Sequence, residues 1–102
     1  MNHIPVLLNE AIEALNLKPD SVVVDATLGG AGHAKAILQH LGDEGVYVGI
    51  DADKVAIKEA EALKTSKATV HLINDNFTNI GVIVRQLKLQ PTAILADLGW
   101  RS

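Results

Sequence analysis

The sequence predicts an α/β fold in which helices flank one parallel sheet of about four strands. Short apolar runs alternate along the 102 residues with segments whose apolar residues recur at helical spacing, which is typical of strand–helix–strand units. The predicted strands are Val22–Asp25, Val46–Asp51, Thr69–Ile73 and Ala93–Asp97. Right-handed crossovers favour the spatial strand order 3-2-1-4, and ligands of this class bind at the switch point between the first and fourth strands.

Three of the four predicted helices have a local signal for their beginning or their end. The helices are expected near Asn9–Asn16, from about Gly32 to Leu41, after Asp53, and from about Thr78 to Lys88. The run Lys18-Pro19-Asp20 closes the first helix, because proline cannot continue it. Gly42 ends the second, and Asp53 can cap the third.

The composition fits one small domain, residues 1–102, with a single core. Hydrophobic residues make up 48% and charged residues 21%, which excludes a disordered segment, and no apolar run reaches the roughly 18 residues of a membrane span. A net charge of −3 argues against nucleic-acid wrapping by this segment alone, because phosphate binding relies on clustered Lys and Arg. Without cysteines or a signal peptide, the protein is expected to be cytoplasmic, with no membrane attachment.

Residues 25–33, which read DATLGGAGH, predict a ligand-binding loop between the first strand and the next helix. Gly29, Gly30 and Gly32 allow positive φ angles and a close approach of the backbone to a ligand. The helix that follows presents unpaired N–H groups to an anionic group. The loop therefore indicates a nucleotide-like cofactor.

The spacing of the glycines excludes two common nucleotide motifs. A dinucleotide fingerprint fails in the frame that starts at Gly30, because Lys35 stands in place of the third glycine. A P-loop fails because His33 follows Gly32 where a lysine is needed. Asp25 would repel a pyrophosphate but suits an α-ammonium group, so the loop favours S-adenosylmethionine. A nicotinamide-binding oxidoreductase fragment is the disfavoured alternative.

Polar residues end all four predicted strands and therefore meet at one edge of a parallel sheet. They are Asp25, Asp51, the run 74–76 and Asp97. Asp51 lies 19 residues beyond Gly32, close to the spacing of about 20 at which an acidic residue meets a ribose; a helix cap or turn is the structural alternative. Phe77 has two roles open to it, adenine stacking or ordinary core packing.

Several motifs in the expected order resemble the RsmH family, also called MraW. They are HIPVLLNEAIEALNLKPD at 3–20, DATLGGAGH at 25–33, GID at 49–51, NDNF at 74–77 and DLG at 97–99. The resemblance implies a Rossmann-like class I methyltransferase fold that uses S-adenosylmethionine. Family members modify the exocyclic amine of a cytidine in small-subunit ribosomal RNA, so ribosomal RNA and the small ribosomal subunit are the implied partners.

The loop and the resemblance together predict a set of cofactor-binding residues. These are Gly30, Gly32, His33, Ala34, Asp51, Phe77 and Asp97. Asp97 is also the candidate catalytic residue, because a carboxylate that accepts an amine hydrogen stabilises the charge that develops on the nitrogen; cofactor binding alone is its alternative role. No metal site is predicted, since His3, His33, His40 and His71 form no i, i+4 pair and have no nearby acidic partner arranged for Zn²⁺.

The sequence departs from the family pattern near its end. The family usually continues as DLGVSSPQ, whereas Trp100 and Arg101 follow DLG here. We therefore expect the cofactor-binding half of such an enzyme, without the C-terminal strands and the inserted helical region. A non-catalytic S-adenosylmethionine-binding or assembly module is the second hypothesis. The predicted strand at 93–97 would leave an open edge, so either self-association through it or marginal stability is expected.

Overall fold

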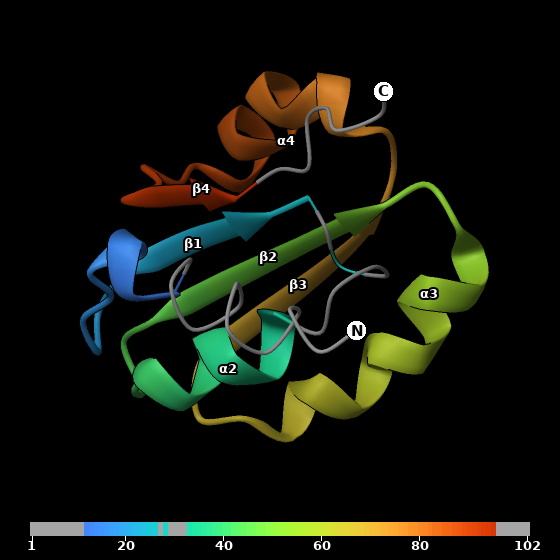
Figure 1. Cartoon of the computed structure of the whole chain (residues 1–102). Coiled ribbons are helices and arrows are strands. Elements are labelled where there is room, and N and C mark those ends of the chain that lie inside the picture. Colours follow the sequence, from blue (N-terminus) through green and yellow to red (C-terminus); the bar gives the residue numbers. More distant parts are fainter. Residues whose placement is uncertain (1–11, 27, 29–32, 96–102) are drawn as a thin grey trace.

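The computed structural model of the chain describes residues 12–26, 28 and 33–95 (Figure 1). Its strands are β1 (Val22–Asp25), β2 (Val46–Asp51), β3 (Thr69–Asn74) and β4 (Ala93–Leu95). They form one parallel sheet in the order β3-β2-β1-β4, which confirms the predicted α/β class and strand order. Val24 on β1 pairs in register with Val48 on one side and with Ile94 on the other.

The helical elements cover both faces of this sheet. They are α2 (His33–His40), α3 (Lys54–Glu59), the 3₁₀ helices η1 (Ala60–Thr65) and η2 (Phe77–Asn79), and α4 (Ile80–Leu87). Figure 1 shows α2 and α3 on one face and α4 on the other. Residues 12–15 are also helical, and the rest of the first predicted helix lies outside the described residues.

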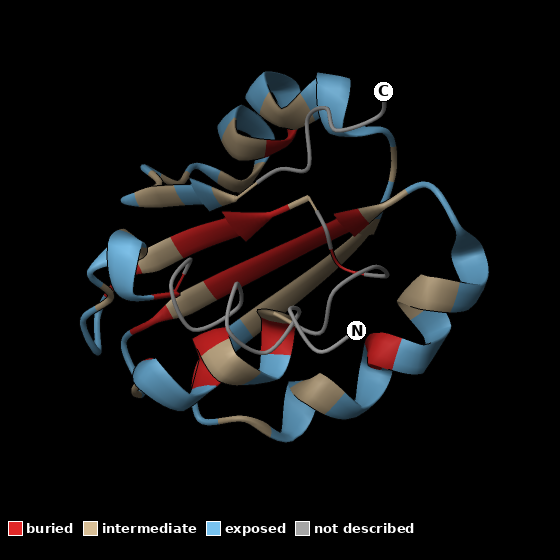
Figure 2. Cartoon of the chain, in the orientation of Figure 1, coloured by how far each residue is buried: buried red, intermediate tan, exposed pale blue. Residues whose placement is uncertain are grey.

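Alternating side chains of the central strands divide the core into two layers. Val23 and Tyr47 pack with Ile37 on the α2 face, whereas Val24 and Val48 pack with residues of α4 on the opposite face. All four strand residues are completely buried, and β1 and β2 form the buried centre in Figure 2. This two-sided burial explains the continuous apolar runs of β1 and β2, because a strand covered on both faces needs no polar side.

The helix ends agree with the local signals, with two differences. Asp53 caps α3 as predicted, since its side chain accepts a hydrogen bond of 2.9 Å from the N–H of Val55. The predicted third helix changes into the tighter η1 at Ala60, and the predicted fourth is preceded by the turn η2. Such 3₁₀ turns are frequent at helix ends, where backbone groups lack full α-helical partners. In the described parts of the chain, no helix is long and apolar enough to cross a membrane.

Candidate functional site

The strands end together at one edge of the sheet, which we call the carboxyl edge, near Asp25, Asp51 and Asn74. Hydrogen bonds join the ends of β2 and β3. The carbonyl of Asp51 accepts bonds from the side-chain amide of Asn74, at 3.0 Å, and from the N–H of Asp75, at 3.1 Å. At the end of β1, the N–H of Ala26 donates to the carbonyl of Leu95 at 2.8 Å. Hydrogen bonds at the carboxyl edge therefore join the end of β2 to that of β3, and the end of β1 to that of β4.

A cavity of about 260 Å³ opens at the carboxyl edge. Its lining consists of Ala26, Ile50, Asp51, Ala52, Asp75, Asn76 and Phe77. Small apolar groups thus meet two carboxylates and one aromatic ring. Ligand pockets commonly hold roughly 300–1,000 Å³, so this cavity suits a nucleoside-sized part of a ligand.

Asp51 takes part in a turn at the end of β2. Its Oδ1 accepts a hydrogen bond of 2.8 Å from the N–H of Asp53, the residue that caps α3. The turn interpretation of Asp51 is therefore confirmed. Because Asp51 also lines the cavity, the turn fixes the carboxylate at the place where a ribose contact is predicted.

Phe77 begins η2 and lies at the cavity. Its side chain is 40% exposed and belongs to neither of the two buried clusters. A partly exposed phenyl ring that lines a cavity can pack against a flat partner. The structure therefore does not support core packing as the main role of Phe77.

The other predicted site residues divide into two groups. His33 is the first residue of α2, and Ala34, the next, is buried in the core beneath that helix. Because α2 follows β1, its N-terminus lies on the side of the carboxyl edge. Gly30, Gly32 and Asp97 lie outside the described residues, as do Trp100 and Arg101.

Tyr47 is a residue of this region that sequence analysis missed. Its hydroxyl donates a hydrogen bond of 2.6 Å to Oδ2 of Asp25, and both residues are completely buried. Burial raises the pKa of Tyr47 above its ordinary value, and the negative charge and hydrogen bond of Asp25 raise it further. Asp25 is completely buried in this structure, and its contact with an ammonium group stays a prediction.

The register of the strands contains the signal for this pair. Tyr47 pairs with Val23, two residues before Asp25, so both polar groups lie on the same face of the sheet. Gly49 is the next residue of that face on β2. A Cβ at Gly49 would lie 3.1 Å from both Leu28 Cδ1 and Tyr47 Cε2, so the glycine leaves space for Leu28 beside the pair.

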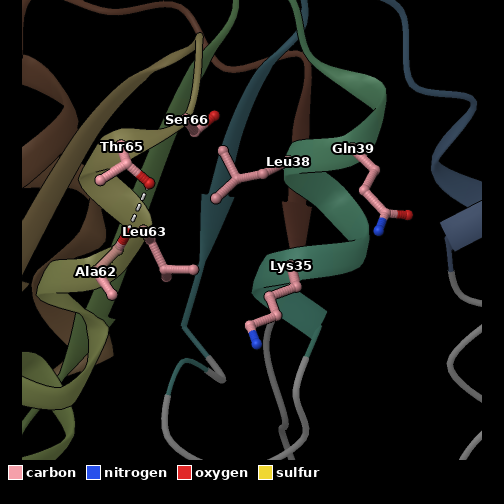
Figure 3. A pocket seen from close by; sticks show the side chains of 7 residues that line it. All are labelled: Lys35, Leu38, Gln39, Ala62, Leu63, Thr65 and Ser66. Atoms are coloured by element: carbon pink, nitrogen blue, oxygen red, sulfur yellow. Dashed lines mark hydrogen bonds between the residues drawn. The ribbon is translucent and has the colours of Figure 1, made fainter.

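A second hollow lies between α2 and η1 (Figure 3), and it shares no lining residue with the cavity at the carboxyl edge. Leu38 and Leu63 point toward one another across it, and its volume is about 330 Å³. Thr65 donates its hydroxyl to the carbonyl of Ala62 at 3.0 Å. Most of its exposed lining is apolar, although Lys35, Gln39, Thr65 and Ser66 also belong to it.

The comparisons with known proteins agree on one family. Residues 1–102 match the model of the MraW methylase family. The chain is 46% identical over 103 residues to ribosomal RNA small subunit methyltransferase H of Clostridioides difficile (strain 630), a match that covers 99% of the chain and 33% of that relative. The protein of the same name from Clostridium botulinum (strain Hall) is 45% identical over 101 residues, with 98% of the chain and 33% of the relative covered.

A solved structure shares the fold. The crystal structure of a putative rRNA-methylase from Clostridium thermocellum matches with a TM-score of 0.61 and 26% sequence identity. The match covers 74% of this chain and 45% of that one. The chain spans about a third of the length of the curated relatives that it matches.

Proposed function

Because the chain belongs to the MraW methylase family, we propose that it is the cofactor-binding part of an S-adenosylmethionine-dependent methyltransferase that acts on ribosomal RNA. The main supporting observation is that Asp51 and Phe77 line one cavity at the carboxyl edge. A carboxylate and an aromatic ring in one cavity match the two halves of a nucleoside, its ribose hydroxyls and its flat base.

Different residues of the site bind different parts of the cofactor. Asp51 accepts hydrogen bonds from the ribose hydroxyls, and Phe77 stacks on the adenine. The backbone N–H groups of Gly32, His33 and Ala34 bind the carboxylate of the amino-acid part at the start of α2, and Gly30 lets the loop approach it. When bound, S-adenosylmethionine supplies a methyl group that is activated by the positively charged sulfur.

The substrate is the exocyclic amine of a cytidine in small-subunit ribosomal RNA, as the family resemblance implies. Two relatives have names that refer to this ribosomal subunit. Asp97 accepts a hydrogen of that amine and so stabilises the positive charge that develops on the nitrogen during transfer. The protein works in the cytoplasm, where it meets the subunit.

Cofactor binding is tested by titrating the chain with S-adenosylhomocysteine and with NAD by calorimetry. We expect binding of S-adenosylhomocysteine alone. Asp51→Asn keeps an oxygen for the turn with Asp53 but removes the charge, so it should weaken binding roughly tenfold. The exposed Asp43, changed to Asn, is the matched control and should leave binding unchanged. Binding of NAD alone would overturn the proposal.

A second candidate function is a non-catalytic S-adenosylmethionine-binding or assembly module. The two functions differ in methyl transfer to small ribosomal subunits, measured with a radiolabelled methyl donor. Transfer by this chain alone supports the enzyme. Cofactor binding without transfer, both alone and with the remaining part of a relative added, supports the module.

We also propose that the chain associates with itself through β4. This strand pairs only with β1 among the described strands, and Ile94 on it is 52% exposed. An open strand edge with an exposed apolar side chain is a template for pairing with a second copy.

A further inference from the structure

Tyr47 is not among the described residues that line the cavity at the carboxyl edge, and it has no part in the proposed function so far. Its hydroxyl nevertheless reaches Asp25, the last residue of β1, through a buried hydrogen bond of 2.6 Å. Burial of a carboxylate or a hydroxyl without a partner is costly. The bond therefore holds the end of β1 at a fixed place on β2.

The ring of Tyr47 lies close to Leu28, three residues beyond the end of β1. A Cβ at Gly49 would lie 3.1 Å from Cε2 of Tyr47 and 3.1 Å from Cδ1 of Leu28, so both side chains approach the bare backbone of this glycine. Leu28 is only 9% exposed and belongs with Tyr47 to the buried cluster of the α2 face. Tyr47 thus supports the start of the connection from β1 to α2 with both its hydroxyl and its ring.

The same buried cluster contains Ala34, the second residue of α2. Leu28 and Ala34 also line one hollow beside α3, so the connection and the first turn of α2 lie next to each other. Because protein interiors are close-packed, a shift of Leu28 is passed on to its neighbours in the cluster. In the proposed function, the N–H groups of His33 and Ala34 bind the carboxylate of the cofactor's amino-acid part.

We propose that Tyr47 is a positioning residue of the cofactor site, which holds the first turn of α2 where it binds the amino-acid part of S-adenosylmethionine. The inference rests on the proposed function, because that function assigns this contact to α2. Tyr47 does not touch the ligand and acts through Asp25 and Leu28. Binding groups need such support from behind, because a site that is slightly misplaced loses much of its affinity.

The nucleoside end of the site has supports of its own. Asp51 is fixed by the hydrogen bond of 2.8 Å that its Oδ1 accepts from the N–H of Asp53. Phe77 begins η2, which is capped by the side chain of Asn76. Loss of the Tyr47 hydroxyl should therefore affect the amino-acid part of the cofactor and leave the nucleoside contacts intact.

The experiment compares S-adenosylhomocysteine with 5′-methylthioadenosine, which has the same nucleoside and sulfur but lacks the amino-acid part. Calorimetry of the whole chain measures the affinity for each. Tyr47→Phe should weaken binding of S-adenosylhomocysteine roughly tenfold, the lower end of the about 10–100-fold that loss of a supporting residue costs in metal sites. Binding of 5′-methylthioadenosine should stay unchanged.

Two glycine variants complete the test. Gly45→Ala is the control for a general loss of stability, because its Cβ would lie 2.7 Å from the carbonyl oxygen of Pro19, before the start of β2. It should bind both ligands as the unchanged chain does. Gly49→Ala disturbs Tyr47 and Leu28 without removing the hydroxyl, and it should show the same selective loss. It replaces Tyr47→Phe if circular dichroism shows that this variant does not fold.

The pair of ligands separates positioning from folding. A folded Tyr47→Phe variant, or Gly49→Ala in its place, that binds S-adenosylhomocysteine normally or loses both ligands equally overturns the inference alone. The same selective loss in Gly45→Ala also overturns it, because stability would then explain the effect. Failure of the unchanged chain to bind S-adenosylhomocysteine overturns the proposed function, and this inference with it.

Discussion

The hydroxyl of Tyr47 donates a 2.6 Å hydrogen bond to Oδ2 of Asp25 in the completely buried centre of the sheet. Asp25 is the last residue of β1 and the first of the glycine-rich stretch, whereas Tyr47 lies on the neighbouring strand. A buried carboxylate is costly unless hydrogen bonds replace its water. Tyr47 therefore stabilises the place where the sheet leads into the predicted loop.

Tyr47→Phe should lower the free energy of unfolding by about 1–3 kcal/mol, because the change removes a donor from a buried carboxylate and leaves the ring in place. Urea unfolding followed by circular dichroism measures the effect. Adding Asp25→Asn tests the cause, since a neutral amide is less costly to bury without that donor. We expect a coupling energy of about 0.5–3 kcal/mol between the two changes. Strictly additive effects would contradict a direct interaction.

The same hydrogen bond predicts a loss of stability at alkaline pH. The pKa of Tyr47 is higher in the folded chain than its ordinary value of 10.0, so the folded state holds this proton more tightly than the unfolded state. The resulting stability is complete below pH 10 and decreases as the pH rises above it, by up to about 1.4 kcal/mol per pH unit. Comparison with Tyr47→Phe isolates this contribution, because every other titrating group is present in both proteins.

Unfolding measured from pH 8 to 11 should show the stability advantage of the unchanged chain over Tyr47→Phe shrinking above pH 10. An advantage that stays constant over this range would show that Tyr47 titrates as an ordinary exposed tyrosine does.

The parts of the fold that depend on local patterns were predictable from sequence. The alternation of strands and helices implied the order of the sheet, and the short side chain of Asp53 before an amphipathic segment marked the start of α3. These signals act over a few residues or follow from the handedness of crossovers. The convergence of Asp51 and Phe77 followed from the same rule, because parallel strands end at one edge.

The pairing of Tyr47 with Asp25 was not predicted, because it depends on the register between β1 and β2. A shift of one residue would place Tyr47 on the opposite face of the sheet. Without the register, only the charge of the aspartate before the glycines can be used, and a charge at that position predicts a ligand contact. The exposure of Phe77 was also not predictable, since an aromatic residue before a helix packs inward in many proteins.

Two glycines should respond to alanine in opposite directions. A Cβ at Gly45 would lie 2.7 Å from the carbonyl oxygen of Pro19 and 2.8 Å from the Cβ of Leu41, so Gly45→Ala should destabilise the fold by about 1–3 kcal/mol. A Cβ at Gly81, on α4, meets nothing within 4 Å. Gly81→Ala should therefore stabilise the chain by about 0.5–1 kcal/mol, because alanine loses less entropy in a helix.

Thermal unfolding of both variants gives the comparison directly, since each substitution adds the same single methyl group. A lower melting temperature is expected for Gly45→Ala and a higher one for Gly81→Ala. Equal shifts of the same sign would contradict the packing around Gly45.

Ile94→Lys should weaken self-association through β4. Ile94 is 52% exposed on a strand that pairs only with β1 among the described strands. Two copies that paired through this strand would bring their lysines close together, and the two positive charges would repel each other. Sedimentation velocity over a hundredfold range of concentration should show dimers or larger species for the unchanged chain and fewer of them for the variant.

Val55→Lys is the matched control, because Val55 is an apolar residue of α3 with 61% exposure and lies away from the strand edge. The same change of charge at Val55 should leave the association intact. If both variants reduce association equally, net charge governs it and the edge of β4 does not. If the unchanged chain sediments as a monomer throughout, self-association through β4 is wrong, and the exposed Ile94 needs another explanation.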